Sequence, residues 1–331
     1  MMRRVLSAVA LAALIAVVAG CPEDKKGGPA EGGAKTLTFA VIPKADVFTF
    51  WPTVRRGAQA ACTELGIEMV WRGAKDETSN TEEIQIVELM IGKKVDGIVL
   101  APQSATALVN VVEKAVAAGI PVVIIDSGLN SDKQVSFVAT DNYKGGVMGA
   151  ERLAKVIGGK GKVALIKNIP GSASTEDREK GFKDAIAKHP DITLVDEKHA
   201  LGDSTKANEV VTTILAKHDD LAGIFTANEP GAVGALLAAK RAGKVGKVRI
   251  VGFDASKLLI KGIRDGDLDS TIVQDPFQMG YQGVKALYDH IQGKTVPEEV
   301  LPEAKLVTTD NLDSEEIQGH LEAYGADAKA K

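Results

Sequence analysis

Short apolar runs alternate with longer amphipathic stretches over most of this chain. The apolar runs lie at residues 37–42, 67–71, 96–101, 120–126, 162–167, 192–197, 221–227, 248–254, 270–274 and 305–309. Between most of them the apolar positions recur near every 3.6 residues, as in TVRRGAQAACTEL and KANEVVTTILAKH. Continuous apolar strands joined by helices are typical of parallel sheets that are covered on both faces. The pattern therefore predicts an α/β fold.

The two halves of the chain repeat one unit. DGIVLAP at 96–102 leads through a helical stretch to IPVVIIDS at 120–127, and AGIFTANE at 222–229 leads in the same way to VRIVGFDA at 248–255. Each unit ends in an apolar strand followed by an aspartate, Asp126 or Asp254. The repeat predicts two similar doubly wound (Rossmann-like) domains. Their border is expected near ATDNYKGG at 139–146, where glycine and polar residues interrupt the pattern.

The first 35 residues differ from the rest. Arg3 and Arg4 precede 16 apolar and small residues, and the run closes with VAGC, ending at Cys21. This order is typical of an export signal; a transmembrane anchor, the alternative, needs roughly 20 apolar residues. VAGC resembles the bacterial lipobox, which implies cleavage before Cys21 and acylation of its thiol; a plain secretory signal is the other possibility. Residues 22–35, rich in Gly, Pro and charge, predict a flexible tether.

Composition and motifs narrow the classes of function. The chain has 40 Lys and Arg residues and 44 Asp and Glu residues. This weakly negative balance argues against a nucleic-acid-binding protein, which needs clustered basic residues. Its histidines are scattered without Cys/His pairs or H-E-x-x-H spacing, so we predict no metal site and no cofactor. Neither a phosphate loop nor a G-x-S-x-G elbow is present. Cys62 lies in a helical pattern and is expected to be a buried, inert thiol.

Polar residues follow several predicted strands: Asp126, Asn228, Glu229, Asp254 and Gln274. Arg178 lies early in a helix, just after the turn PGSASTED. In open parallel sheets, ligands bind beyond the carboxyl ends of the strands, so two domains facing each other would bring these groups to one cleft. Carboxylates accept hydrogen bonds from hydroxyls, amides both donate and accept, and a guanidinium offers a fork of donors. The set favours a polyhydroxylated ligand.

Aromatic residues cluster at one place in an aromatic-poor chain. Of 14 Phe, Trp and Tyr residues, three lie in VFTFWP at 47–52, between the first strand and the first helix. This is the same end of the sheet as the polar residues. The apolar C–H face of a sugar ring packs on aromatic side chains, which are largely apolar. Phe50 and Trp51 are therefore expected to wall the cleft, and Phe48 to lie in the core or at its lip.

Each candidate also has a purely structural interpretation. An aspartate after a strand is commonly a turn former or an N-cap, Arg178 could pair with an adjacent carboxylate, and Trp51 could belong to the core. Asp126 and Asp254 could also be the two carboxylates of a hydrolase. The sequence does not fix their separation, and the neighbouring Asn, Gln and Arg residues favour holding a ligand over cleaving it.

From about Thr36 to Thr309 the chain resembles the type I periplasmic solute-binding proteins of ABC importers, in particular ribose-binding-protein-like sugar binders. The resemblance is carried by FWPTVRRGAQAA, VDGIVLAPQSATAL, GIPVVIIDS, VATDNYKGGVMGAERLA, REKGFKDAI, GIFTANEPGAVGALLAAKRAG, VGFDAS and TIVQDPFQMGYQGVKAL. It implies two α/β domains joined by three crossovers, near Asp141, Gln274 and Glu303, with a sugar between them. The signal peptide stands where related repressors carry a DNA-binding head, which excludes repression.

The resemblance also implies boundaries and roles. Residues 36–140 with 275–303 form the N-terminal lobe, 141–274 with 304–315 the C-terminal lobe, and 316–331 a C-terminal tail. Phe50 and Trp51 match the stacking aromatics of the family. The matching polar clamp consists of Asp126, Arg178, Asn228, Asp254 and Gln274.

Departures from the ribose pattern leave the ligand open. Ribose binders carry Asp-Arg where this chain has Asp126-Ser127, Asn-Pro at Ala101-Pro102, an aromatic residue at Gly202 and an asparagine at Phe48. A hexose, a sugar alcohol or a modified sugar is therefore as plausible as ribose. Asp46, Gln103 and Glu229 are weaker ligand candidates that could replace the contacts made by the missing ribose-binder residues.

The expected function is that of a non-enzymatic, monomeric receptor in the periplasm or cell envelope. It would be lipid-anchored at Cys21, bind a small sugar-like ligand by hinge closure, and deliver it to an ABC permease. One alternative is a sugar sensor of the same fold that serves a chemoreceptor or sensor kinase. A secreted hydrolase is the other.

Overall fold

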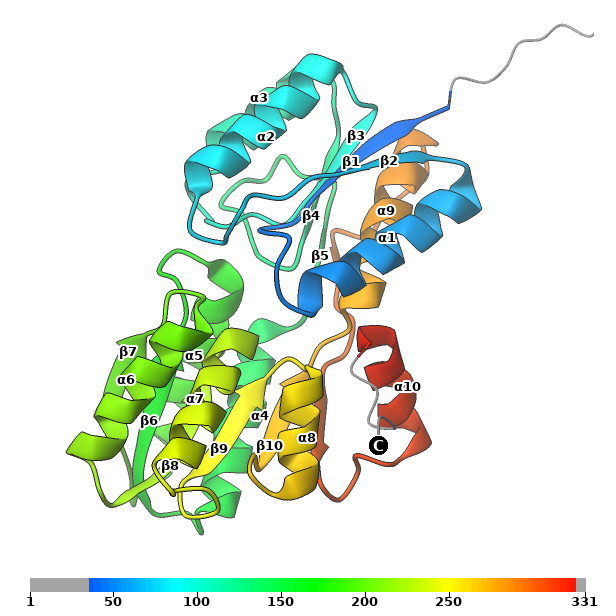
Figure 1. The fold of residues 1–331 in the computed structure, drawn as a ribbon. Coiled ribbons are helices and arrows are strands. Elements are labelled where there is room, and N and C mark those ends of the chain that lie inside the picture. Colours follow the sequence, from blue (N-terminus) through cyan, green and yellow to red (C-terminus); the bar gives the residue numbers. More distant parts are fainter. Residues whose placement is uncertain (1–35, 326–331) are drawn as a thin grey trace, which may run out of the picture. The chain divides into compact units, whose positions relative to one another are not determined.

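Helices and strands alternate through residues 36–325, the part of the chain that the computed structural model describes (Figure 1). The predicted signal peptide, Cys21, the tether and residues 326–331 lie outside this range. The strands are β1 (Thr38–Ile42), β2 (Glu68–Trp71), β3 (Gly97–Leu100), β4 (Val122–Ile125), β5 (Ser136–Val138), β6 (Gly161–Lys167), β7 (Ile192–His199), β8 (Leu221–Thr226), β9 (Arg249–Phe253), β10 (Ser270–Val273), β11 (Glu299–Val300) and β12 (Lys305–Thr308). The helices are α1 (Phe50–Leu65), α2 (Asn80–Lys93), α3 (Val109–Ala117), α4 (Asn142–Val156), α5 (Ala173–Ile186), α6 (Ser204–Lys217), α7 (Glu229–Arg241), α8 (Lys257–Asp265), α9 (Pro276–Ile291) and α10 (Glu315–Tyr324).

The strands form two sheets with matching topology. The N-terminal lobe contains the order β11-β5-β4-β3-β1-β2, and the C-terminal lobe the order β12-β10-β9-β8-β6-β7. Every pairing is parallel except that of β10 with β12. The predicted pair of doubly wound α/β domains is therefore confirmed, and β4 and β9, which precede the two aspartates, hold equivalent places.

Helices cover both faces of each sheet (Figure 1). In the N-terminal lobe, α1 and α9 pack together on one face, and α2 and α3 cover the other through Ile86, Met90 and Val112. In the C-terminal lobe, α4 packs against α5, and α6 against α7. This double cover explains why most strands are apolar along their whole length rather than at alternate positions.

In the described part of the chain, residues 36–325, the backbone passes between the two sheets three times. It does so between β5 and α4, between β10 and α9, and between β11 and β12. These places agree with the crossovers predicted near Asp141, Gln274 and Glu303. Because these three segments are the covalent links between the lobes within residues 36–325, they are the natural hinge of the fold.

Glycines allow the helix pairs to approach closely. A Cβ added at Gly57 of α1 would lie 1.9 Å from the Phe277 carbonyl oxygen of α9, and one at Gly146 of α4 would lie 2.0 Å from the Arg178 carbonyl oxygen of α5. No side chain can occupy such a space without separating the helices. A close contact between a glycine and a backbone carbonyl therefore joins one helix pair in each lobe.

All ten predicted strands are present, and three further elements were not predicted. Strands β5 and β11 have three and two residues, too short for a periodic signal. Helix α10 lies in the segment expected only as a C-terminal tail; Ile317, Leu321 and Tyr324 form its buried stripe.

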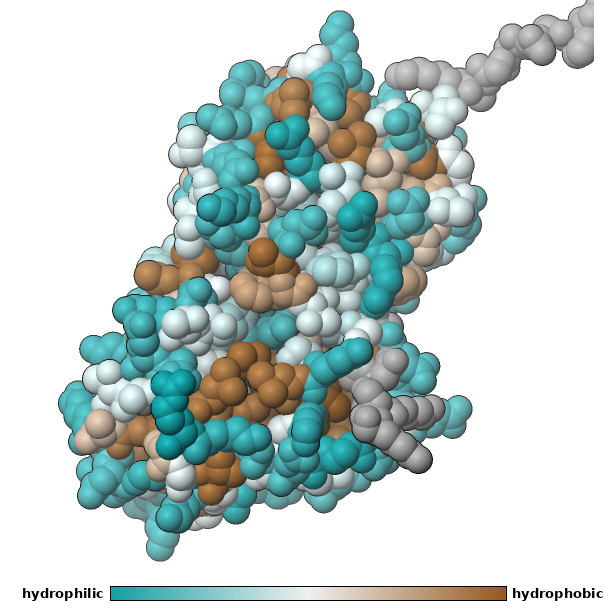
Figure 2. Space-filling view, in the orientation of Figure 1, coloured by the Kyte–Doolittle hydropathy of each residue, from teal (hydrophilic) through white to brown (hydrophobic). Residues whose placement is uncertain are grey.

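Exposed apolar side chains gather over α7 and α8, where Leu237 and Leu258 reach the surface (Figure 2). Within residues 36–325, none of the helices has the length and apolar character needed to cross a membrane.

Candidate functional site

A cavity of about 40 Å³ lies between the two lobes. All seven main ligand candidates line it: Phe50, Trp51, Asp126, Arg178, Asn228, Asp254 and Gln274. The wall also includes Lys44, Phe48 and Glu77 of the N-terminal lobe and Asn168, Ser174 and Thr175 of the C-terminal lobe. The carboxyl ends of both sheets therefore meet at one place.

The two aspartates occupy equivalent and unusual backbone positions. Asp126 follows β4 with φ 62°, and Asp254 follows β9 with φ 71°. Each backbone N–H donates to the neighbouring strand, Asp126 to the Val138 carbonyl at 3.0 Å and Asp254 to the Ile272 carbonyl at 2.7 Å. Left-handed backbone is costly for residues other than glycine, although Asp tolerates it, and it clusters at functional sites. The turn directs both carboxylates into the cavity.

Both carboxylate oxygens of Asp254 accept hydrogen bonds. Its Oδ1 accepts a hydrogen bond from Gln274 Nε2 at 2.6 Å, and its Oδ2 accepts one from the Glu229 backbone N–H at 3.0 Å. Burial raises the pKa of Asp254, and the Arg178 guanidinium opposes that shift. Two hydrogen bonds thus fix the orientation of this carboxylate at the cavity wall.

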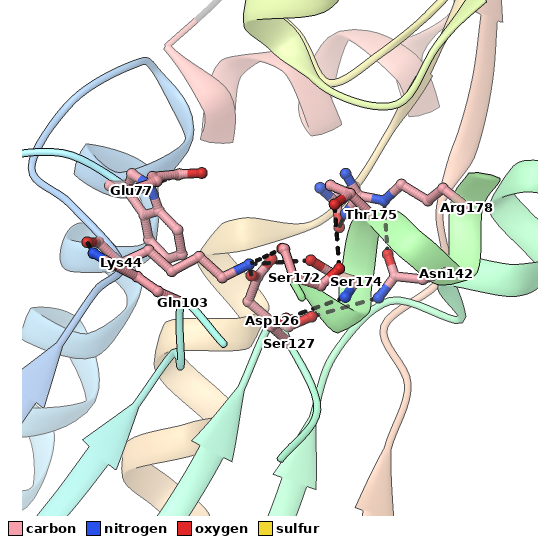
Figure 3. Close-up of polar contacts among 12 residues, drawn as sticks. Lys44, Glu77, Gln103, Asp126, Ser127, Asn142, Ser172, Ser174, Thr175 and Arg178 are labelled. Atoms are coloured by element: carbon pink, nitrogen blue, oxygen red, sulfur yellow. Dashed lines mark hydrogen bonds and ion pairs between the residues drawn. The ribbon is translucent and has the colours of Figure 1, made fainter. Parts of the chain in front are cut away.

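Arg178 is almost fully buried and bonded along its whole guanidinium. Nε donates to Asn142 Oδ1 at 2.8 Å (Figure 3). One terminal nitrogen donates to the Ala227 carbonyl at 3.0 Å, and the other donates to Gln274 Oε1 at 2.9 Å. The guanidinium also lies 3.9 Å from the Phe253 ring centroid. These partners, rather than an adjacent carboxylate, hold Arg178 at the cavity wall.

Lys44 is a cavity residue that the sequence did not single out. It lies shortly after β1, and its Nζ forms an ion pair with Asp126 Oδ2 at 2.8 Å. The same nitrogen donates to Ser172 Oγ at 3.2 Å and to Ser174 Oγ at 3.1 Å, so it joins both lobes (Figure 3). The strand-end rule that found Asp126 also applies to Lys44 and to Asn168, which directly follows β6.

The aromatic wall is formed by Phe50 and Trp51 at the start of α1. Their rings meet edge to face, with centroids 4.8 Å apart. Trp51 is only 2% exposed, yet it lines the cavity, and its Nε1 donates to Glu77 Oε1 at 2.8 Å. Phe48 also lines the cavity, with φ 64°. The predicted aromatic wall is thus present at the cleft.

Two residues at the start of α7 face the other lobe or the cavity. Asn228 is the N-cap of α7, and its Oδ1 accepts a bond from the Gly231 N–H at 3.1 Å. Glu229 accepts bonds from the Thr49 N–H at 3.1 Å and the Thr49 hydroxyl at 3.3 Å. Burial, and then the nearby Asp254 carboxylate, raise the pKa of Glu229 to about 7.

Two weaker candidates lie away from the cavity wall. Asp46 is exposed and accepts a bond from Trp71 Nε1 at 3.2 Å. Gln103 is buried, and its Nε2 donates to the Lys44 carbonyl at 2.6 Å and the Asp76 carbonyl at 2.8 Å. Gln103 therefore supports the loop that carries Lys44. Of the three weaker candidates, only Glu229 lines the cavity.

Comparison with known proteins decides the family. The family model described as a periplasmic binding protein domain matches residues 39–295. The chain belongs to this family. The D-allose-binding periplasmic protein of Escherichia coli (strain K12) is 32% identical over 278 residues, covering 81% of this chain and 89% of that protein.

Solved structures agree with the assignment to the periplasmic binding proteins. A carbohydrate transporter solute-binding protein from Agrobacterium radiobacter, in complex with D-arabinose, has a TM-score of 0.84 and 32% identity, covering 86% of this chain and 99% of that one. An ABC transporter solute-binding protein from Agrobacterium vitis with bound D-fucose has a TM-score of 0.83 and 36% identity, covering 85% and 98%. These relatives are binding proteins, so the chain stands among solute-binding proteins and not among enzymes.

In this periplasmic binding protein the lobes contact each other around the cavity. The Ser174 N–H donates to Ser127 Oγ at 3.1 Å, and the Ala105 N–H donates to the Gly171 carbonyl at 3.0 Å. Together with the bonds of Lys44 and Thr49, these contacts describe a closed cleft. Among residues 36–325, no group of three or more His, Cys, Asp and Glu side chains is arranged to hold a metal ion.

Proposed function

We propose that this periplasmic binding protein is the sugar-binding component of an ABC importer. It captures a monosaccharide or a similar polyhydroxylated solute and delivers it to an inner-membrane permease. The observation that carries the proposal is the convergence of two aspartates, an arginine, two amides and two aromatic rings on one cavity. Two related structures contain bound D-arabinose and D-fucose, and a third relative is named a D-allose-binding protein, which supports a sugar as the ligand.

The proposed contacts follow from the chemistry of each side chain. Asp126 and Asp254 accept hydrogen bonds from ligand hydroxyls, while Arg178 and Asn228 donate to ligand oxygens. Phe50 and Trp51 pack against the C–H face of the ring. Gln274 links Arg178 to Asp254 and orients both.

Lys44 supplies a second cation at the site. The chain has Ser127 where ribose binders have an arginine, so one guanidinium is missing next to Asp126. The Lys44 ammonium, 2.8 Å from Asp126, provides charge and donors on that side instead. The proposed ligand is a sugar rich in hydroxyls, and ribose stays among the candidates, because one curated relative is named a ribose import binding protein.

The proposed mechanism is closure about the three crossovers. The N-terminal lobe, residues 36–140 with 275–303, rotates against the C-terminal lobe, residues 141–274 with 304–315. In the open form water hydrates the polar clamp, and burying these charges without partners is costly. Ligand hydroxyls replace the water and bridge both lobes, so the ligand shifts the population toward the closed form. The permease then recognises the surface of the closed form.

Residues 1–21 are proposed to be a lipoprotein signal and residues 22–35 the tether. Cleavage before Cys21 and acylation of its thiol would hold the receptor at the membrane. Replacing Cys21 with Ser is expected to move the protein from the membrane fraction to the soluble periplasmic fraction. A Cys21→Ser protein that stays with the membrane fraction would remove the lipid anchor from the proposal.

A thermal-shift screen tests the function. Purified protein is mixed with pentoses, hexoses, sugar alcohols and nucleosides, including D-ribose, D-allose, D-arabinose and D-fucose. A ligand that binds only the folded state stabilises it by about 2.7 kcal/mol at 100 times its Kd. Calorimetry of the hit should give one site and no product. Turnover of the sugar, or no sugar hit at all, contradicts the proposal.

A further inference from the structure

Helix α10 lies beyond the segment that the family model matches, which ends at residue 295. The helix follows β12 and belongs to the C-terminal lobe, since Asp313 just before it pairs with Arg264 of α8 at 2.8 Å. Ser314 caps its start, and Ile317, Leu321 and Tyr324 are buried. The helix is therefore packed against the body of the protein and ends at Tyr324.

Tyr324 touches the binding site without lining the cavity. Its side chain is 1% exposed, and its hydroxyl donates to Asp254 Oδ1 at 3.3 Å. Its ring centroid lies 6.5 Å from that of Phe50, with the planes tilted by 60°. One residue of α10 thus contacts both the clamp carboxylate and the aromatic wall.

The same end of α10 also reaches the other lobe. Thr53 of α1 donates its hydroxyl to the Tyr324 carbonyl at 3.2 Å. One turn earlier, His320 Nε2 lies 2.6 Å from the Gln274 carbonyl oxygen, an arrangement in which the ring nitrogen donates. Because Gln274 is itself a donor to Asp254 Oδ1, α10 supports Asp254 by two routes.

We propose that α10 is part of the sugar-binding machinery and that Tyr324 is a positioning residue for Asp254 and Phe50. The inference rests on the proposed function, because it assigns Tyr324 an effect on sugar affinity. The hydroxyl fixes the carboxylate in its ionised, acceptor form, and the ring fixes the angle of the aromatic wall. The contact with Thr53 forms between lobes, so α10 also favours the closed arrangement.

Tyr324→Phe tests the hydroxyl while keeping the ring. The matched control is Tyr281→Phe, because the Tyr281 hydroxyl also donates to a carboxylate, Glu64 Oε2 at 2.5 Å, on the exposed side of α9. Calorimetry uses the full-length chain and whichever of D-ribose, D-allose, D-arabinose and D-fucose binds wild type most tightly. A hydrogen bond to a charged acceptor at this long distance predicts roughly tenfold weaker binding for Tyr324→Phe. The control should bind within about twofold of wild type.

The pH profile separates positioning from a general structural effect. Lower pH protonates Asp254 and weakens binding, and losing the Tyr324 donor destabilises the carboxylate form, so Tyr324→Phe should lose affinity at a higher pH than wild type. The charged and titratable groups facing Asp254 are Arg178 on α5, Glu229 on α7, Asp126 after β4, Glu77 before α2 and Tyr324 on α10. All except Tyr324 are unchanged in both variants.

The outcomes are distinct. A tenfold loss together with the shifted pH profile, absent in Tyr281→Phe, supports the inference. Wild-type affinity and pH profile in Tyr324→Phe overturn it while leaving the proposed function intact. Wild-type protein that binds none of the four sugars overturns the proposed function and the inference with it.

Discussion

Asp126 and Asp254 combine a strained backbone with a buried charge, and both features serve the site. A left-handed φ at each places the carboxylate at the mouth of its sheet. An isolated buried carboxylate would be costly, but Lys44 pairs with Asp126, and Gln274 and the Glu229 N–H hold Asp254. The two carboxylates are thereby held in fixed positions at the cavity, as the proposed binding of ligand hydroxyls requires.

Replacing Asp254 with Ala should weaken sugar binding by more than about 2 kcal/mol, because a charged hydrogen bond is lost and ligand hydroxyls are left without a partner. Calorimetry with the sugar identified by the screen measures the change. Asp46→Ala is the matched control, since Asp46 is exposed and lies away from the cavity wall. Equal affinities in the two variants would remove Asp254 from the site.

Glu83 predicts a pH-dependent stability. Burial raises its pKa to about 8; one oxygen accepts from the Gln103 N–H at 3.0 Å, and the other has no hydrogen-bond partner. The folded protein keeps this proton between the ordinary carboxyl pKa and about 8, whereas the unfolded chain releases it. Stability therefore falls as pH rises through this window.

The melting temperature of the ligand-free protein should be about 5 °C lower at pH 8.5 than at pH 6. Glu83→Gln should flatten much of this slope, since it cannot ionise. Glu88→Gln, on the same helix but exposed and paired with Lys114, should keep the wild-type slope. Scanning calorimetry at several pH values measures the melting temperature of each variant. An unchanged slope in Glu83→Gln would contradict the assignment of the pH dependence to Glu83.

Among single residues, the sequence analysis predicted cavity residues that directly follow strands, but it missed residues that loops or α10 bring to the site. Asp126, Asn228, Asp254 and Gln274 were found because a strand-end rule applies to them. Glu77 and Tyr324 reach the site through the loop before α2 and through α10, and no periodicity signals either approach. Lys44 and Asn168 also lie at or shortly after strand ends, so the sequence could have predicted them.

Among the elements, the paired helices α1–α9 and α4–α5 bear directly on the site. The glycine contact between Gly146 and the Arg178 carbonyl sets how close α5 lies to α4, and α5 carries Arg178 to the cavity. The sequence predicted the helices from their apolar spacing. It did not reveal the glycine contacts, because a helical glycine carries no periodic signal of its own.

Gly146→Ala should destabilise the protein by about 1–3 kcal/mol, since α4 and α5 must separate to admit the methyl group. It should also weaken sugar binding by displacing Arg178. Gly92→Ala is the control: Gly92 is helical, and nothing lies within 4 Å of its added Cβ, so this change should be neutral or stabilising by up to about 1 kcal/mol. Chemical denaturation ranks the two, and a Gly146→Ala protein as stable as Gly92→Ala would disprove the tight contact.

In the molecule as a whole, the predicted two-lobe architecture is confirmed because strand–helix alternation is a strong pattern repeated many times. The closed contacts between the lobes were not predictable, since they depend on single loop residues. Ser127, which stands where ribose binders carry an arginine, accepts a hydrogen bond from the Ser174 N–H of the other lobe.

Ser127→Ala should therefore impair closure without altering the cavity wall. Without the Ser127 hydroxyl, the buried Ser174 N–H has no hydrogen-bond acceptor in the closed form. The loss predicts roughly tenfold weaker sugar binding. The melting temperature of the ligand-free protein should change little. Small-angle scattering across a sugar titration should show that the radius of gyration falls only at higher sugar concentration than in wild type.

Ser131→Ala is the control, because the Ser131 hydroxyl bonds only within the N-terminal lobe, to Glu113 at 3.0 Å. It should close at wild-type sugar concentrations. If Ser127→Ala does the same, the contact with Ser174 does not contribute to closure.

The position of α10 bears on how the protein is best produced. The hydroxyl and carbonyl of Tyr324 are engaged at the site and at α1, so a fusion partner or purification tag placed directly after α10 would crowd both contacts. Recombinant material tagged at that end is expected to report altered affinities. A cleavable tag ahead of Thr36, in place of residues 1–35, leaves this helix unaltered.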